Sequence, residues 1–282
     1  MVTFPGAEVW PSLGLGTWRM GEIAARRGAE VGAVRAAVEM GYRVIDTAEM
    51  YGEGGAEEVV GRALAECLRA GVVGRDELFI VSKVYPHNAS AAGTVAACER
   101  SMRRLGLDRI DCYLLHWRGS VPLAETVAAF EGLRARGRIR HWGVSNFDLD
   151  DMQELLAVDG GGRCSANQVY YSLSTRGPAF SLLPWQAARG IVTMAYSPID
   201  QGELLSEPVL QEVAARRAAT PAQVALAWLT AQPGVMALPK STDPARLREN
   251  LAAPSVQLEP ADLAILDRAF PPPRRKTPLA MR

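Results

Sequence analysis

Four side chains capable of acid–base chemistry, Asp46, Tyr51, Lys83 and His116, lie at or just after the ends of three short apolar segments. A tyrosine has an unperturbed pKa of about 10, so it is a weak acid at neutral pH. An ammonium such as Lys83 favours the phenolate and lowers that pKa, and a carboxylate such as Asp46 can compensate the buried ammonium. The phenol could then give a proton to a carbonyl oxygen, hydrogen-bonded by His116, while the carbonyl carbon receives a hydride.

Each of these residues by itself has an ordinary structural interpretation. An aspartate at a strand end often caps a helix, a tyrosine usually packs, a lysine can form a surface ion pair, and a histidine can be half buried. Four polar side chains at neighbouring strand ends, each in an apolar context, would be costly to bury without a role. The combination therefore favours a catalytic site, provided that the fold brings the strand ends together.

Short β-branched runs alternate with segments of 3.6-residue periodicity along the whole chain. The expected strands are Leu13–Gly16, Arg43–Thr47, Leu78–Lys83, Ile110–His116, Arg140–Val144, Ala166–Val169, Val192–Tyr196 and Val235–Pro239. The expected helices are Val31–Met40, Ala56–Ala70, Ala91–Leu105, Leu123–Arg136, Leu149–Ala157, Phe180–Ala188, Pro221–Ala231 and Pro244–Leu251. Eight repeated strand–helix units in one chain of 282 residues favour a closed (β/α)8 TIM barrel over an open doubly wound sheet.

We expect one domain over residues 1–282, because the glycine run at 160–162 is too short to be a linker. The amino-terminal segment is expected to pair as a hairpin across the barrel bottom. A helix near Ala261–Ala269 and a short basic tail are expected to follow the last unit. Functional residues of such barrels lie at the carboxyl ends of the strands, so the four candidate side chains would share one mouth.

Composition excludes several classes of function. The chain has 31 basic and 31 acidic residues, so no net charge favours nucleic acid or anionic membranes. The four cysteines form no C-x-x-C pair and have no histidine nearby, so we expect no metal site and a reducing, cytoplasmic environment. We expect a small-molecule substrate and neither nucleic acid nor membrane as partner, while a monomer and a weak oligomer both remain open.

Ordered motifs along essentially the whole chain resemble one known family. They are Gly14-Leu15-Gly16-Thr17-Trp18, Gly41-Tyr42-Arg43-Val44-Ile45-Asp46-Thr47-Ala48, Tyr51-Gly52, Val81-Ser82-Lys83, Leu114-Leu115-His116-Trp117, Gly143-Val144-Ser145-Asn146-Phe147, Asn167-Gln168, Ala195-Tyr196-Ser197-Pro198, Pro239-Lys240-Ser241 and Arg246-Leu247-Arg248-Glu249-Asn250. This series resembles the aldo-keto reductases, barrel enzymes that usually use NADPH. The resemblance implies that Tyr51 is the general acid, that Lys83 and Asp46 tune it, and that His116 orients the carbonyl.

The resemblance also implies a cofactor groove. The residues implied at the nicotinamide are Gly16, Thr17, Trp18, Asp46, Ser145, Asn146, Gln168 and Tyr196. Those implied along the pyrophosphate are Ser197, Ile199 and Gln201, and those implied at the ribose 2′-phosphate and adenine are Lys240, Ser241, Arg246, Glu249 and Asn250. Barrels often bind phosphate after the seventh and eighth strands at a helix amino terminus, where amides and the dipole favour an anion. Lys240 and Arg246 there favour NADPH over NADH.

By the same resemblance, aromatic and apolar side chains would line the substrate pocket. They are Trp18, Met50, Tyr51, Tyr85, His87, His116 and Trp117. Such a lining suits small aldehydes and ketones. Because little of the chain follows Pro273, we expect an open, tolerant site. The segments Ala48–Tyr51 and Ser82–Pro86 resemble a bacterial branch that reduces methylglyoxal and other 2-oxoaldehydes.

The expected activity is therefore NADPH-dependent reduction of small aldehydes and ketones to alcohols, and two other functions stay open. Lys83 at a strand end could form a Schiff base, as in barrel aldolases, although this leaves Lys240, Arg246 and Tyr196 without a role. A non-catalytic NADPH-binding sensor or accessory subunit is the second, and the presence of all four candidate catalytic side chains weighs against it.

Overall fold

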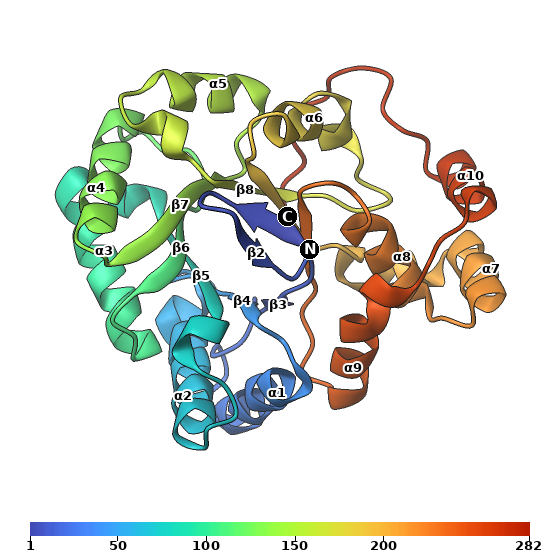
Figure 1. Cartoon of the computed structure of the whole chain (residues 1–282), viewed down its shortest axis with the longest axis horizontal. Helices are drawn as coiled ribbons and strands as arrows, with labels where there is room; N and C mark the ends of the chain where they lie inside the picture. Colours follow the sequence, from blue (N-terminus) through green and yellow to red (C-terminus); the bar gives the residue numbers. More distant parts are fainter.

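Eight short, buried strands form one parallel sheet in which neighbours in the sheet are neighbours in the chain. They are β3 (Leu15–Gly16), β4 (Val44–Asp46), β5 (Phe79–Val84), β6 (Ile110–Leu115), β7 (Ile139–Ser145), β8 (Ala166–Tyr170), β9 (Val192–Tyr196) and β10 (Val235–Leu238). The first and last strands meet, because Leu13 bridges Ala237 in parallel and the Gly14 N–H donates to the Ala237 carbonyl at 2.9 Å. This computed structural model describes residues 1–282 and confirms the predicted TIM barrel (Figure 1).

Ten helices surround the strands (Figure 1). They are α1 (Arg27–Met40), α2 (Gly55–Arg69), α3 (Ala91–Leu105), α4 (Leu123–Ala135), α5 (Leu149–Ala157), α6 (Leu182–Ala187), α7 (Pro208–Arg217), α8 (Pro221–Thr230), α9 (Pro244–Ala252) and α10 (Pro260–Ala269). Several begin at a residue whose side chain satisfies free backbone amides. Ser90 caps α3, Asp148 caps α5, and Thr220 with Gln223 forms a capping box on α8.

The helix predictions differ from the structure by more than one residue at three places. Helix α7 was not predicted, because one helix was assigned to each strand and α7 is an additional helix that packs against α8 and α10. Helix α1 begins at Arg27 rather than Val31. The segment predicted as Phe180–Ala188 is a short 3-10 turn followed by α6, because the backbone at Ser181 leaves the helical region with φ −142°.

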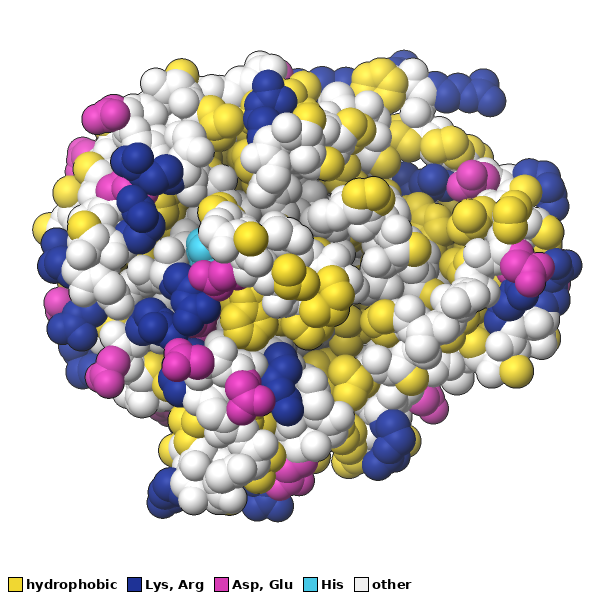
Figure 2. All heavy atoms as spheres, viewed as in Figure 1, with side chains coloured by type: hydrophobic (Ala, Val, Ile, Leu, Met, Phe, Trp, Pro, Cys, Tyr) yellow, Lys and Arg dark blue, Asp and Glu magenta, His cyan; other side chains and the backbone are white.

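The interior of the barrel is apolar and is closed at one end by a hairpin. Strands β1 (Val2–Phe4) and β2 (Glu8–Trp10) pair antiparallel. The Phe4 ring lies with its centroid 4.7 Å from that of Phe79, inside the barrel. Figure 1 shows this hairpin lying across the strands, and Figure 2 shows hydrophobic side chains gathered at the centre of the same face. The functional site must therefore lie at the opposite end, where the strands finish.

The chain after α10 forms no helix or strand and crosses that end of the barrel. Figure 1 shows it leaving α10 and passing α6 before the carboxyl terminus. The Lys276 ammonium, in the middle of this segment, lies 2.6 Å from an oxygen of Asp150 in α5. None of the helices in the structure combines the length and the apolar character that a membrane span requires.

Candidate active site

The ends of β4 and β5 place Lys83 at the centre of a polar cluster. Its side chain is 0% exposed, and its Nζ lies 2.8 and 2.9 Å from the two carboxylate oxygens of Asp46. The same nitrogen donates to the Thr47 carbonyl at 2.9 Å and lies 3.3 Å from the Tyr51 hydroxyl oxygen. The predicted convergence of Asp46, Tyr51 and Lys83 is therefore present.

The cluster keeps Lys83 charged and Tyr51 protonated. Burial by itself would lower the pKa of Lys83, but Asp46 and Tyr51 outweigh it and the pKa of this ammonium is raised. Burial raises the pKa of the Tyr51 phenol, and the Lys83 charge offsets only part of that rise. Lys83 thus lowers the pKa of Tyr51 in the expected direction, but the net pKa is raised because desolvation of the phenolate is the larger effect. A phenol that keeps its proton at neutral pH is still available as an acid.

His116, at the end of β6, completes the cluster. Burial, followed by the charge of Lys83, holds the pKa of its imidazole well below the usual 6.5, so the ring is neutral. Its ring packs edge-on to Tyr51 with the centroids 5.8 Å apart, and its Nδ1 is buried without a hydrogen-bond partner. A neutral imidazole has one N–H to donate, so His116 can hydrogen-bond a ligand oxygen beside Tyr51.

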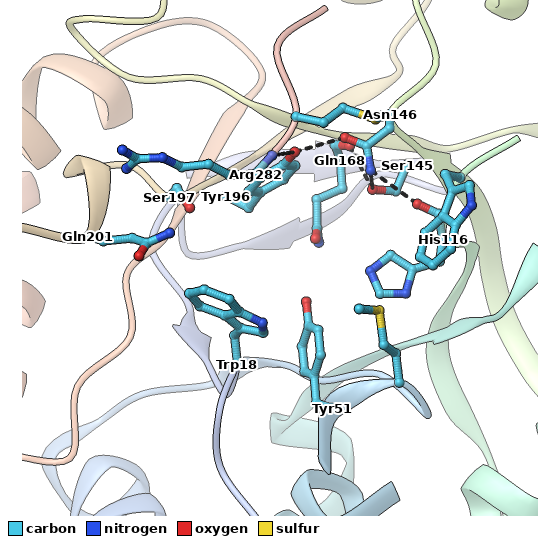
Figure 3. A pocket seen from close by; sticks show the side chains of 13 residues that line it. Trp18, Tyr51, His116, Ser145, Asn146, Gln168, Tyr196, Ser197, Gln201 and Arg282 are labelled. Carbon is cyan, nitrogen blue, oxygen red and sulfur yellow. Dashed lines mark hydrogen bonds between the residues drawn. The ribbon is translucent and has the colours of Figure 1, made fainter. Parts of the chain in front are cut away.

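Tyr51 and His116 face a cavity of about 370 Å³ at the carboxyl ends of the strands (Figure 3). Its lining comprises Trp18, Met50, Tyr51, His116, Trp117, Ser145, Asn146, Gln168, Tyr196, Ser197, Gln201, Met281 and Arg282. Two residues expected in the substrate pocket, Tyr85 and His87, lie outside this lining. Their ring centroids lie 4.6 Å apart, and the Tyr85 hydroxyl donates to Glu53 at 3.4 Å.

Met281 and Arg282 were not expected in the cavity. The carboxyl-terminal segment folds back over the barrel mouth, so the site is less open than the short segment after Pro273 suggested. The Arg282 N–H donates to the Tyr196 hydroxyl at 3.4 Å. No local sequence signal marks this return, because it depends on contacts with distant elements.

A second cavity of about 570 Å³ continues the first, since Trp18, Ser197 and Gln201 line both. Its lining includes Ile199, expected along the pyrophosphate, and all the residues expected at the 2′-phosphate and adenine, namely Lys240, Ser241, Arg246, Glu249 and Asn250. The structure therefore brings together, along one groove, residues from the end of β7 to α9. Sequence reasoning missed Arg19, Gly202, Leu205 and the start of α8 at residues 220–222, which also line it.

Gly16, Thr17 and Asp46, expected beside the nicotinamide, line neither cavity. Thr17 donates to the Asp46 carbonyl through its N–H at 3.0 Å and its hydroxyl at 2.9 Å. Gly16 lies so close to the last strand that an added Cβ would meet the Leu238 carbonyl oxygen at 3.0 Å. These residues therefore support the cavity from beneath.

The polar residues at the ends of β7, β8 and β9 bond to one another (Figure 3). Asn146 accepts a hydrogen bond from the Tyr196 hydroxyl at 2.9 Å and donates to the His116 carbonyl at 3.2 Å. Gln168 donates to an Asp46 oxygen at 2.8 Å, and Ser145 donates to the Gln168 carbonyl at 2.9 Å. The network fixes these side chains relative to Asp46 and His116, a coupling that the sequence did not reveal.

The far end of the groove is cationic. Partial burial lowers the pKa of Lys240, and the charges of Arg19 and Arg26 lower it further, whereas Glu30 raises it. An anion beside Lys240 would therefore be favoured. The Ala245 and Arg246 amides at the start of α9 already donate to Asp243 at 2.8 and 3.2 Å, so these two amides are not free for a phosphate. The side chains of Lys240, Ser241 and Arg246 line the cavity there.

Comparison with known proteins gives one consistent relationship. Residues 12–270 match the model of the Aldo/keto reductase family. The chain is 48% identical over 286 residues to Methylglyoxal reductase YeaE of Escherichia coli (strain K12), covering 100% of this chain and 98% of that protein. A crystal structure of an aldo-keto reductase from Klebsiella pneumoniae in complex with NADPH is 48% identical with a TM-score of 0.92, covering 100% of this chain and 98% of that one. A second structure from that organism, with NADP and acetate, is 48% identical, has a TM-score of 0.94 and covers 100% and 99%.

Proposed function

Because this chain belongs to the aldo/keto reductase family, an oxidoreductase family that uses NADP(H), we propose that it reduces small aldehydes and ketones, 2-oxoaldehydes among them, to alcohols. The observation that carries the proposal is the Tyr51 hydroxyl, 3.3 Å from the buried Lys83 ammonium and facing the cavity that it shares with neutral His116. This arrangement suits the transfer of one proton to one carbonyl oxygen.

The groove fits NADPH by its distribution of charge. Lys240 and Arg246 lie at one end, where an anionic ribose phosphate would find cations, and the other end is uncharged apart from Arg282. Tyr196 offers an aromatic face to a planar ring there. When bound, NADPH supplies the hydride that the carbonyl carbon accepts.

The protein's own residues then handle the oxygen and the proton. His116 and Tyr51 both donate to the carbonyl oxygen, which holds the carbon in one orientation. As the C=O π electrons move to that oxygen, the Tyr51 hydroxyl gives up its proton and becomes a phenolate. The Lys83 ammonium stabilises the phenolate, and Asp46 keeps Lys83 in place through two contacts of 2.8 and 2.9 Å. Solvent returns the proton to Tyr51 after the alcohol leaves.

Methylglyoxal, or another small 2-oxoaldehyde, is the substrate class that we propose to test first. The support is the 48% identity to an E. coli protein named methylglyoxal reductase and a cavity of only about 370 Å³ next to Tyr51. Met50, Trp18 and Trp117 give this cavity an apolar side. We also propose a cytoplasmic location, since the four cysteines are free and buried, as expected in a reducing compartment.

The contacts of Lys83 weigh against a Schiff-base aldolase. An imine requires a neutral amine with a free lone pair, whereas this nitrogen is 0% exposed, pairs with Asp46 and has a raised pKa. A non-catalytic NADPH sensor would have no use for a protonated Tyr51 beside His116.

The test is NADPH consumption by the purified protein against methylglyoxal, an aromatic aldehyde, a sugar aldehyde and a ketone. We expect turnover with the highest kcat/KM for the 2-oxoaldehyde. Borohydride treatment with each carbonyl compound should leave Lys83 unmodified. Tight NADPH binding without any turnover would contradict the proposal and favour the sensor, and a trapped Lys83 adduct would favour the aldolase.

A further inference from the structure

The chain from residue 271 to 282 ends with a charged side chain above the groove. Arg282 lines the first cavity together with Ser197 and Gln201, and these two residues also line the second. Figure 3 shows its side chain extending from the Tyr196 hydroxyl toward Ser197 and Gln201. Arg282 therefore lines the first cavity beside two of the residues through which that cavity continues into the second.

Arg282 is held there by an exposed ion pair. Its Nη2 lies 2.6 Å from an oxygen of Glu203, and the two side chains are 29% and 73% exposed. Exposed pairs of this kind are worth little, about 0 to 1 kcal/mol, because water screens both charges. A better anion placed at the same point could therefore replace Glu203 at low cost.

Glu203 belongs to a strained segment that borders the groove. The 3-10 segment η7 (Asp200–Ser206) contains Asp200 and Gln201 with φ of 50° and 58°, and Ser197 just before it has φ 47°. Residues other than glycine rarely adopt this left-handed conformation, and such strain persists only where surrounding contacts enforce it. Here Asp200 accepts hydrogen bonds from the Tyr170 hydroxyl, at 2.8 Å, and from Ser174.

Arg19, whose guanidinium stacks 4.3 Å from the centroid of the Trp18 ring, is the one cation that lines the second cavity besides Lys240 and Arg246. The residues expected along the pyrophosphate, Ser197, Ile199 and Gln201, are uncharged, and the nearby carboxylates of η7 would repel an anion. Lys240 and Arg246 line the second cavity from other elements: Lys240 follows β10, and Arg246 lies in α9. A dinucleotide carries two negative charges on its pyrophosphate, and a guanidinium binds such oxygens in pairs.

We propose that Arg282 is a further cofactor-binding residue, whose guanidinium leaves Glu203 and pairs with the pyrophosphate when the dinucleotide binds. The inference rests on the NADPH dependence described above. Glu203 acts as the competitor for Arg282 before the dinucleotide binds. Since the pyrophosphate is common to NADPH and NADH, Arg282 strengthens the binding of both, in contrast to Lys240 and Arg246, which face the 2′-phosphate.

The test measures dissociation constants by quenching of intrinsic tryptophan fluorescence, since Trp18 lines both cavities. Arg282→Gln should weaken NADPH and NADH by similar factors, about tenfold for a lost charge-assisted contact, and leave adenosine 2′-monophosphate, which has no pyrophosphate, unchanged. Arg282→Lys should recover part of the loss. Arg275→Gln, a change at an exposed arginine of the same segment, serves as the matched control and should alter nothing.

Glu203→Gln distinguishes two roles of Arg282. In one, Arg282 moves from Glu203 to the pyrophosphate; in the other, its pair with Glu203 only anchors the chain end. If Arg282 must leave Glu203, this variant should bind both dinucleotides as tightly as the native protein or two- to threefold more tightly. Unchanged NADPH affinity in Arg282→Gln would overturn the inference, as would equal weakening in Arg282→Gln and Glu203→Gln. Absence of NADPH binding by the native protein would instead contradict the proposed function, so the two failures are distinguishable.

Discussion

Replacement of Lys83 by methionine tests the electrostatic role of the ammonium. Two unit charges 3.3 Å apart, the distance from Lys83 Nζ to the Tyr51 oxygen, interact by about 5 kcal/mol at an effective dielectric constant of about 20. The carboxylate of Asp46 opposes part of this stabilisation of the phenolate. We therefore expect Lys83→Met to cost about 3 kcal/mol in the transition state, which lowers kcat about a hundredfold.

The pH profile identifies the cause of that loss. Tyr51 is active when protonated, so kcat should be constant at lower pH and fall as pH rises through the pKa of Tyr51. Lys83 lowers this pKa against the larger effect of burial, so its removal raises the pKa further. The alkaline fall in Lys83→Met should move to higher pH while the plateau drops. A lower plateau whose alkaline fall stays at the same pH, or moves to lower pH, would refute the reasoning.

Folding must be separated from chemistry in this experiment. Lys83→Met leaves the buried Asp46 carboxylate without its cation, and breaking a buried pair typically costs about 3 to 5 kcal/mol of stability. The double variant Lys83→Met/Asp46→Asn removes both charges and should recover most of the free energy of unfolding measured in urea. Its kcat should stay low, which would show that the lost activity does not come from misfolding.

Three further predictions concern the groove, the histidine and the barrel bottom. Lys240→Ala/Arg246→Ala should weaken NADPH far more than NADH in fluorescence titrations, and equal weakening would mean that these cations do not face the 2′-phosphate. Burial lowers the pKa of His116 in the folded protein, so below about pH 6.5 the unfolded chain binds more protons than the folded one. The contribution of His116 to the free energy of unfolding is therefore full above that pH and falls as pH decreases. His116→Gln should flatten this part of the stability curve, and an unchanged slope would contradict the assignment. Phe4→Ala should cost about 3 to 5 kcal/mol of stability at unchanged kcat, since Phe4 packs inside the closed end of the barrel.

The barrel and the convergence of Asp46, Tyr51, Lys83 and His116 were predictable because each rests on a local signal repeated in order. Lys83 and His116 end apolar strands, and parallel strands put their carboxyl ends on one side, so convergence follows from topology alone. The capping role of Asp243 could also have been read from its place before Pro244, and it argues against free amides at the start of α9. Local rules thus sufficed wherever the functional residue lies on a strand end or a helix start.

The remaining features depend on contacts between residues far apart in the chain. Arg282 lines the cavity at the end of a segment whose contacts, from Lys276 to Asp150 and from Arg282 to Glu203, are with residues far away in the chain, and no local pattern encodes such a path. The net direction of the Tyr51 pKa depends on how completely its neighbours exclude water, which side-chain types alone do not determine. The extra helix α7 was missed because the repeating pattern assigned one helix to each strand.

The most direct test of the central claim is a single-turnover measurement of methylglyoxal reduction by Tyr51→Phe preloaded with NADPH. Tyr113→Phe is the matched control, because the Tyr113 hydroxyl is buried without a partner and lies away from the cavity. We predict native NADPH affinity in both variants and a reduction rate about 10² to 10⁴ lower in Tyr51→Phe alone. A native reduction rate in Tyr51→Phe would contradict the assignment of Tyr51 as the proton donor.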